Sequence, residues 1–378
     1  MIKNLQFTKE INLIFASIFL FAMAIGIDLV TFPAILNENN INSAQIGIIS
    51  IFEICGGIFA SLILSKFVAK SGLQKTMAIA AISYGICILS IYFYQGFFLW
   101  LAFVFLMGFC WFLYVITRQA WFNMMLSDEQ RGIANGVFSA SISLGLASGP
   151  AIVKFSGATN YTSFIISAAI VLVSYLLISK IKVEKTMNLC DKKISLKEFY
   201  SQNSQCFVGR FCLDFQTYFL LVFTVIYGVK INLSYETAGL LLIAYMISGF
   251  FDIMVGFILK KANPYKIMNI GFIIAPLSFF TILFFNKSYP ALLILFFTFG
   301  LGIACIYVSV FKLANESFSK EKLVAANSTF QIIGSIASLC GGFFGGLAIS
   351  YFGATGFPLT IIFINLVYLG FVLFLRKI

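Results

Sequence analysis

Residues 11–36 read INLIFASIFLFAMAIGIDLVTFPAIL, an apolar run with one charged residue, Asp28. A helix needs about 20 predominantly apolar residues to cross the hydrocarbon core of a bilayer, and this run exceeds that length. Lys3 and Lys9 precede it, as basic residues precede the apolar core of a signal peptide. The run lacks a convincing cleavage site and many equally long runs follow, so we interpret it as the first membrane span.

The composition of the whole chain supports this interpretation. The 378 residues are 61% hydrophobic and 10% charged, whereas a soluble domain is about 25% charged. This argues against a soluble globular enzyme, a disordered chain and a nucleic-acid-binding protein. The sequence has no His, which removes His-based metal sites and Ser-His-Asp triads, and it has no phosphate-binding loop. We therefore expect no enzymatic activity, no cofactor and no metal site.

Apolar runs continue along the chain and predict an all-α membrane protein of twelve transmembrane helices. One long polar stretch near the middle divides them into two pseudo-symmetric six-helix halves, residues 1–180 and 206–378, joined by a cytoplasmic linker, 181–205. The linker stretch 194–199 suits either a short interfacial helix or a solvated segment. The predicted spans are 11–36, 43–65, 76–94, 97–117, 132–153, 161–179, 207–229, 237–259, 267–286, 290–311, 323–350 and 356–375.

The distribution of the basic residues behind the net charge of +11 indicates how the chain is oriented in the membrane. With both termini inside, all but three of the 25 Lys and Arg residues fall in cytoplasmic segments, the exceptions being Lys154, Lys230 and Lys287. An excess of basic residues marks the cytoplasmic side of a membrane protein. We expect a multi-pass protein of a cell inner (plasma) membrane, with cytoplasmic termini.

The two halves resemble each other in sequence. The loop after the second span, 65–75, aligns with residues 256–266 at a shift of 191, which places Lys70 over Lys261 and Ser65 over Gly256. Parallel six-span repeats are the internal symmetry of one large transporter class.

Two motifs carry a resemblance to the major facilitator superfamily. Ser65, Lys70, Gly72 and Lys75 occupy the first Gly, the Arg, the second Gly and the last basic position of the loop signature G-x-x-x-D-R-x-G-x-R-K, with Ala69 in place of its Asp. The resemblance covers the whole chain and implies a bacterial-type secondary transporter that works by rocker-switch alternating access.

The fifth span carries the second motif. Gly136, Gly145, Gly149 and Pro150 match the pattern G-x8-G-x3-G-P, which resembles that of proton-linked antiporters, although its closing Gly-Gly is absent. The small residues suit either ordinary close packing of helices or a seam that moves during transport.

Two carboxyl groups lie at similar depth in the outer half of the membrane. Asp28 is about eight residues from the outer end of the first span, and Glu53 about ten from that of the second, at ~1.5 Å per residue. An ionised side chain in a span is expensive unless it has a function or a partner. We interpret both as candidates for carrying a coupled proton; helix capping or structural pairing is the alternative.

Other charged residues in the spans suggest ion pairs and gates. Arg210 and Asp214 are spaced i,i+4 and can pair, as a structural ion pair or as an inner gate. Asp252 is a candidate partner in an inter-helix gate. Arg118 and Lys312 end the fourth and tenth spans, where each either extends to the interface or contributes to an anion-attracting cavity floor.

Polar and aromatic residues of the spans predict an amphipathic substrate cavity, because Tyr and Trp combine apolar contact with one hydrogen bond. The candidates are Tyr84, Trp111, Tyr114, Gln119, Asn135, Gln216, Tyr218, Asn327 and Gln331.

Taken together, these features predict proton-coupled efflux of a small amphipathic compound. Proton-coupled uptake of a small, possibly anionic, metabolite is one alternative, and a transporter-like receptor or lipid-handling scaffold is another. The expected partners are the lipid bilayer, a small-molecule substrate and protons, with no nucleic acid, and we expect a monomer.

Overall fold

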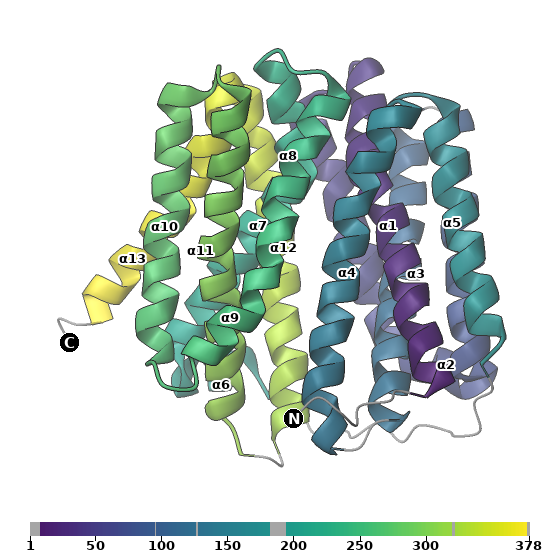
Figure 1. Cartoon of the computed structure of the whole chain (residues 1–378), viewed down its shortest axis with the longest axis horizontal. Coiled ribbons are helices and arrows are strands. Elements are labelled where there is room, and N and C mark those ends of the chain that lie inside the picture. Colours follow the sequence, from purple (N-terminus) through teal and green to yellow (C-terminus); the bar gives the residue numbers. More distant parts are fainter. Residues whose placement is uncertain (1–7, 95, 126–127, 182–193, 320–321, 376–378) are drawn as a thin grey trace. The chain divides into compact units, whose positions relative to one another are not determined.

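The computed structural model describes residues 8–94, 96–125, 128–181, 194–319 and 322–375 (Figure 1). Within these ranges the side chains of residues 64–66, 69, 119–125, 128–136, 139, 323–325 and 327 are outside the description. The described part is helical, and its helices divide into two compact units. Unit 1 comprises residues 1–41 and 49–189, and unit 2 comprises residues 42–48 and 190–378.

Five long helices form the first half of the chain. They are α1 (Lys9–Glu38), α2 (Ser43–Phe93), α3 (Phe97–Met125), α4 (Asp128–Ser156) and α5 (Tyr161–Ser179). In Figure 1, α1 lies between α4 and α5 and packs against both.

The helix α2 holds the second and third predicted spans, which meet at Gly72. This residue has φ 75° and ψ 162°, a left-handed conformation that glycine adopts without a steric cost. The loop signature therefore corresponds to a turn made by a single residue. Gln74, two residues further on, donates from Nε2 to the carbonyl of Ser179 at 2.9 Å and so ties the turn to the end of α5.

The second half of the chain begins with a short helix and continues with longer ones. Its elements are α6 (Leu196–Gln202), α7 (Ser204–Lys230), α8 (Tyr235–Ile247), η1 (Ser248–Phe250), α9 (Phe251–Ile258), α10 (Pro264–Phe285), α11 (Tyr289–Glu316), α12 (Leu323–Phe352), η2 (Gly353–Thr355) and α13 (Gly356–Leu375).

Ten segments of the described residues are long and apolar enough to cross a membrane. One of them, Ser328–Leu375, contains both α12 and α13. Counting these two separately and adding α4 gives one helix for each of the twelve predicted spans. The prediction of an all-α membrane protein of twelve transmembrane helices is confirmed.

The eighth span contains one turn of 3-10 helix between two α-helical segments, and its backbone angles stay helical throughout. The helix α8 ends at Ile247 and α9 starts at Phe251, with the 3-10 turn η1 between them. Ser248 Oγ donates to the carbonyl of Tyr245 at 2.5 Å, which satisfies an acceptor at the end of α8. Gly300 of α11 lies against this turn, where a Cβ would overlap Ser248 Oγ. The absence of a side chain at Gly300 therefore leaves room for the side chain of Ser248.

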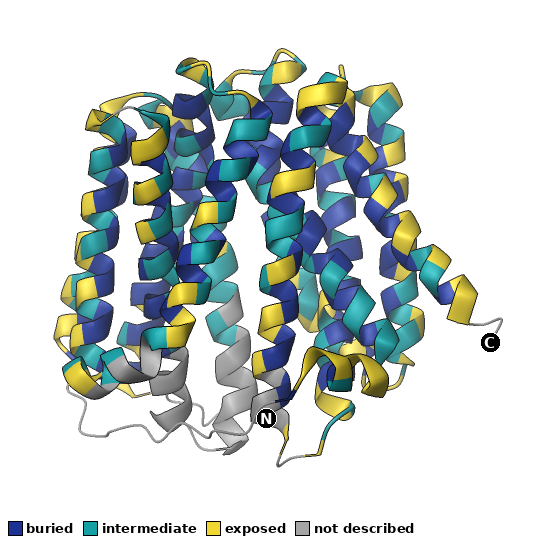
Figure 2. Ribbon diagram, turned by 180° about the vertical axis from the view of Figure 1, so that it is seen from behind, coloured by how far each residue is buried: buried dark blue, intermediate teal, exposed yellow. Residues whose placement is uncertain are grey.

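The helices bury one face and expose an equally apolar one (Figure 2). In α10, Phe272 and Phe279 are buried, whereas Leu277 and Phe284 are 57% and 70% exposed. A helix that is apolar on all sides fits a bilayer, because protein covers one face and lipid the other.

Close helix crossings rely on glycine. A Cβ at Gly26 of α1 would overlap the carbonyl oxygen of Leu146 in α4, and a Cβ at Gly149 would overlap the backbone of Gly26. Gly145 likewise lies against the carbonyl of Phe19. Small residues allow helix backbones in a membrane to approach this closely, so two glycines of the fifth-span motif have a packing role.

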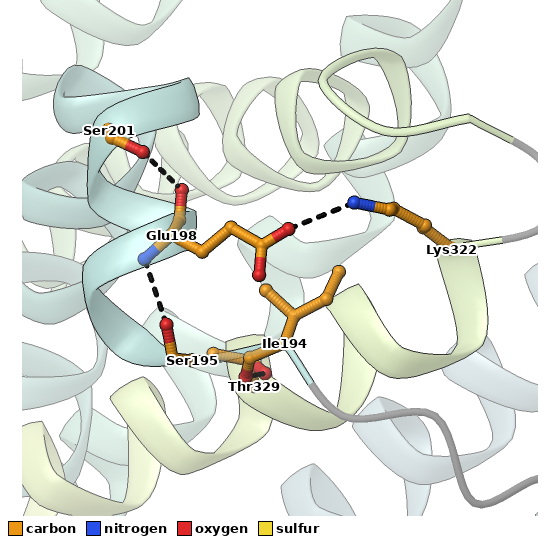
Figure 3. Close-up of polar contacts among 6 residues, drawn as sticks. All are labelled: Ile194, Ser195, Glu198, Ser201, Lys322 and Thr329. Carbon is orange, nitrogen blue, oxygen red and sulfur yellow. Dashed lines mark hydrogen bonds and ion pairs between the residues drawn. The ribbon is translucent and has the colours of Figure 1, made fainter.

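The helix α6 packs against other helices of unit 2 (Figure 3). Ser195 caps its first turn by accepting from the Glu198 amide, and Glu198 forms an ion pair with Lys322 at 3.0 Å. Thr329 Oγ1 of α12 donates to the carbonyl of Ile194 at 2.6 Å. Phe199 is fully buried, with its ring centroid 5.0 Å from that of Phe318. Phe199 thus packs on protein, whereas Leu196 and Tyr200 of the same helix are exposed.

Candidate functional site

Asp28 lies on α1 in the interior of unit 1, 8% exposed. Tyr84 of α2 donates its hydroxyl to Asp28 Oδ2 at 2.9 Å, and Ser167 of α5 donates to Asp28 Oδ1 at 2.9 Å. Within the described part of the chain, no Lys or Arg forms an ion pair with this carboxyl. The sequence singled out Asp28 and Tyr84 separately, and the structure brings them together.

Glu53 is the second carboxyl group of this region. It is partly buried on α2, close enough to Asp28 and Tyr84 to interact with both electrostatically. Its backbone carbonyl faces Gly108 of α3, where a Cβ would overlap the carbonyl oxygen. The two predicted carboxyls therefore belong to one region of unit 1.

Phe21 joins three of the predicted aromatic residues. Its ring centroid lies 5.0 Å from that of Tyr84, 5.5 Å from that of Trp111 and 4.2 Å from that of Tyr114. Phe21 and Asp28 are seven residues apart on α1 and therefore share one face of the helix. We call Phe21, Tyr84, Trp111 and Tyr114 the Phe21 cluster.

Two serines on α5, which are absent from the residues predicted for the site, form hydrogen bonds in this region. Ser174 Oγ donates to the carbonyl of Ser17 at 2.8 Å and lies 2.9 Å from the hydroxyl of Tyr114. Ser167 and Ser174 are also spaced seven apart, and both are fully buried. Polar residues at helical spacing on an otherwise apolar span were the signal that could have found them.

Arg118 is fully buried one turn beyond Tyr114 on α3. Its guanidinium carbon lies 5.0 Å from the ring centroid of Tyr114 and 4.9 Å from that of Phe138. Nε and both Nη atoms have no hydrogen-bond acceptor among the described residues. The charge is thus held between two aromatic faces while its N–H donors stay unsatisfied.

In unit 2, the structure contains the ion pair that the i,i+4 spacing allows. Arg210 Nε lies 2.6 Å from Asp214 Oδ2, and Arg210 Nη2 donates to Gln331 Oε1 at 3.4 Å. The guanidinium also lies over the ring of Phe330, at 4.4 Å. Gly334 of α12 borders the pair, and a Cβ there would overlap Asp214 Oδ2. Two helices therefore shape the surroundings of this pair.

Gln216 has a partner that the sequence did not indicate. It is fully buried on α7, where its Oε1 accepts from Asn365 Nδ2 of α13 at 2.6 Å. A second inter-helix contact lies near the start of α7, where Gln205 Nε2 donates to Tyr368 Oη at 2.9 Å. Tyr218, also on α7, is partly exposed. Gln216 thus sits within the helix packing of unit 2.

Lys312 belongs to α11, and its side chain reaches the C-terminal end of α9, where Nζ donates to the carbonyl of Leu259 at 2.5 Å. The same Nζ lies 3.7 Å from Glu316 Oε1. A cation at a helix C-terminus satisfies carbonyls that have no intrahelical partner. Asp252, in the first turn of α9, is partly buried and forms no ion pair with a described Lys or Arg.

The remaining candidates fall into two groups. Lys70, Lys75 and Lys261 are exposed, and Gly256 is partly exposed on α9. Ser65, Gln119, Asn135, Gly136 and Asn327 lie outside the residues whose side chains the structure describes.

Solved structures with a similar fold are transporters. The nucleoside transporter NupG matches with a TM-score of 0.79 and 12% identity over 96% of this chain and 99% of its own. A bacterial homolog of the human lysosomal transporter Spinster matches at 0.70 and 16% identity, over 91% and 81%. A POT family transporter solved with a thioalcohol-conjugated peptide matches at 0.73 and 15% identity, over 96% of both chains. At these identities the likeness shows the fold alone.

Among proteins of curated function, none matches the sequence significantly. The family model of the major facilitator superfamily matches residues 14–190 and 206–378, which is nearly the whole chain. The family match, the ten apolar segments of the described residues and the transporter structures with a similar fold agree: the chain belongs to the major facilitator superfamily and is a membrane transporter rather than an enzyme.

Proposed function

We propose that this transporter is proton-coupled and that Asp28 carries the proton. The observation that supports this proposal is the setting of the carboxyl group: it is buried, it accepts from two hydroxyl groups, and no described basic residue pairs with it. A buried ionisable side chain without a counter-charge is costly in a membrane protein, so its retention favours a function.

The hydroxyl partners suit both protonation states. Ser167 Oγ lies 2.9 Å from Asp28 Oδ1 and 3.3 Å from the carbonyl of Ala24, so it has a second acceptor when the carboxyl is protonated. The hydroxyl of Tyr84 donates to the carboxylate and can accept from the carboxylic acid. Neither state of Asp28 therefore leaves a partner without a hydrogen bond.

We further propose that the protein exports a small amphipathic compound by rocker-switch alternating access across an inner (plasma) membrane, with both termini cytoplasmic. The Phe21 cluster supplies apolar contact beside the polar Asp28, and the glycines of α4 match the antiporter pattern. Proton-coupled uptake and a receptor or scaffold role are the other outcomes that the experiment separates.

The experiment follows proton movement in proteoliposomes that contain a trapped pH-sensitive dye. A panel of small amphipathic compounds is added. It includes uridine and a dipeptide, because one structure of similar fold is a nucleoside transporter and another was solved with a conjugated peptide. We expect Asp28→Asn to abolish compound-driven proton movement while retaining counterflow of the same compound. Glu38→Gln is the matched control, because Glu38 is an exposed carboxyl on the same helix.

The results have distinct meanings. Proton movement that persists in Asp28→Asn would contradict the assignment of the proton to this residue. Compounds that bind to the wild type without crossing the membrane would favour the receptor. The sign of the proton flux relative to the flux of the compound separates export by antiport from uptake by symport.

A further inference from the structure

Two charges of opposite sign lie at the two ends of the Phe21 cluster. At one end, Tyr84 bonds Asp28 at 2.9 Å and its ring packs on Phe21 at 5.0 Å. Phe21 in turn packs on Tyr114 at 4.2 Å, and Tyr114 lies 5.0 Å from the guanidinium of Arg118 at the other end. An acid, a set of buried aromatic rings and a base therefore form one continuous line of contacts through α1, α2 and α3.

The base at the end of this line lacks acceptors. Arg118 is fully buried, and the rings of Tyr114 and Phe138 attract its positive charge through their faces. A guanidinium has five N–H donors, and an aromatic face does not satisfy them as an oxygen does. Nearly all buried polar groups in proteins have a hydrogen-bond partner, so the three unsatisfied nitrogens require an explanation.

Arg210 of unit 2 provides an internal comparison. It too is buried and lies over two aromatic rings, those of Phe311 and Phe330. Asp214 provides it with a counter-charge at 2.6 Å, and Gln331 Oε1 accepts a hydrogen bond from its Nη2. Among the described residues, Arg118 has the same aromatic setting without an ion-pair partner or a hydrogen-bond acceptor. The missing acceptor at Arg118 is therefore consistent with one that a ligand brings.

We infer that Arg118 binds the anionic group of the transported compound, whose apolar part packs on Trp111, the partly exposed member of the Phe21 cluster, so that the substrate is an amphipathic organic anion. A carboxylate or a phosphate offers two oxygens in the geometry of the guanidinium fork. This inference rests on the transport function proposed above and specifies its substrate class.

The test measures ligand-induced thermal stabilisation of the full-length protein in lipid nanodiscs, because a ligand that binds the folded state raises its apparent stability. The probes are matched pairs that differ in charge: 4-phenylbutyrate with 4-phenylbutyramide, and benzyl phosphate with benzyl alcohol. Inorganic phosphate serves as an anion without an apolar part. Trp111, which packs on Phe21 at 5.5 Å, provides an independent fluorescence signal.

We expect at least one of the two organic anions to stabilise the wild type at millimolar concentration more than its neutral partner, and more than inorganic phosphate does. Arg118→Gln should weaken this binding about 10- to 100-fold, the loss of a charge-assisted hydrogen bond. Lys230→Gln removes an exposed positive charge from α7 and should bind as the wild type does. Arg118→Lys keeps the charge but loses the fork, and should bind several-fold more weakly.

Three outcomes would overturn the inference: neither organic anion stabilises the wild type, the neutral partners stabilise it equally, or Arg118→Gln binds the anions normally. If Arg118→Gln does not fold, Arg118→Lys decides, and unchanged affinity in that variant counts against the inference. Proton movement in Asp28→Asn is measured separately, so the role of Asp28 and the role of Arg118 can be refuted independently of each other.

Discussion

Replacing Phe199 by Ala should release α6 from the other helices of unit 2. The ring is fully buried and packs 5.0 Å from Phe318 and 6.0 Å from Phe330. Truncation of a buried Phe to Ala costs about 3–5 kcal/mol, because it removes apolar contact and leaves a cavity. A helix of seven residues has little stability of its own, so this loss should exceed what its remaining contacts supply.

The other contacts of α6 set the scale for comparison. Glu198 and Lys322 have side-chain exposures of 38% and 55%, and an exposed ion pair contributes about 0.2–1 kcal/mol. Thr329 donates one buried hydrogen bond to Ile194, worth about 1 kcal/mol. We therefore expect the destabilisation to fall in the order Phe199→Ala, Thr329→Val, Glu198→Gln.

Hydrogen exchange of the α6 amides measures this order directly, since each 1.4 kcal/mol of opening free energy changes protection about tenfold. Phe199→Ala should reduce protection by about 100-fold or more, and Glu198→Gln by less than about sixfold. Wild-type protection in Phe199→Ala, or a larger loss in Glu198→Gln, would refute the view that apolar burial holds this helix.

Two further variants test the packing of the spans. Gly26→Ala should lower the free energy of unfolding by about 1–3 kcal/mol, because its Cβ would overlap the carbonyl oxygen of Leu146. Gly370→Ala, at an open position of α13, is the control. Equal effects of the two substitutions would contradict the close crossing of α1 and α4. Asp214→Asn should cost about 3–5 kcal/mol by leaving Arg210 buried without its counter-charge. Adding Arg210→Met should recover part of that loss in a double-mutant cycle, and simple additivity of the two changes would argue against a coupled pair.

Hydropathy was sufficient to predict the membrane helices, because crossing a bilayer imposes length and apolarity on each segment separately. Local spacing was also informative: Arg210 and Asp214 are one turn apart on a single helix, and they pair. The close contact of the eighth span with α11 was not visible in hydropathy, because it joins Ser248 to Gly300 of a different helix.

The candidate site could be predicted only in pieces. Asp28, Tyr84 and Tyr114 were recognisable as polar or amphipathic residues in apolar spans, but Phe21, which joins them, looks like any of the 46 phenylalanines. Its role follows from the packing of α1 against other helices, and a single sequence carries no direct signal for that.

The linker helix shows a related limit. The stretch 194–199 is amphipathic, and amphipathicity alone does not say whether lipid, water or protein meets its apolar face. The burial of Phe199 among aromatic rings of unit 2 identifies protein as the partner of that residue.

The glycine crossing of α1 and α4 has a practical consequence for spectroscopy. The backbones of α1 and α4 are in direct contact at Gly26, Gly145 and Gly149. We therefore expect the two helices to move together as a rigid body during transport. The distance between a spin label on α1 and one on α4 should therefore stay constant and can serve as an internal reference. Distances from either label to unit 2 would then report the conformational change free of deformation within unit 1.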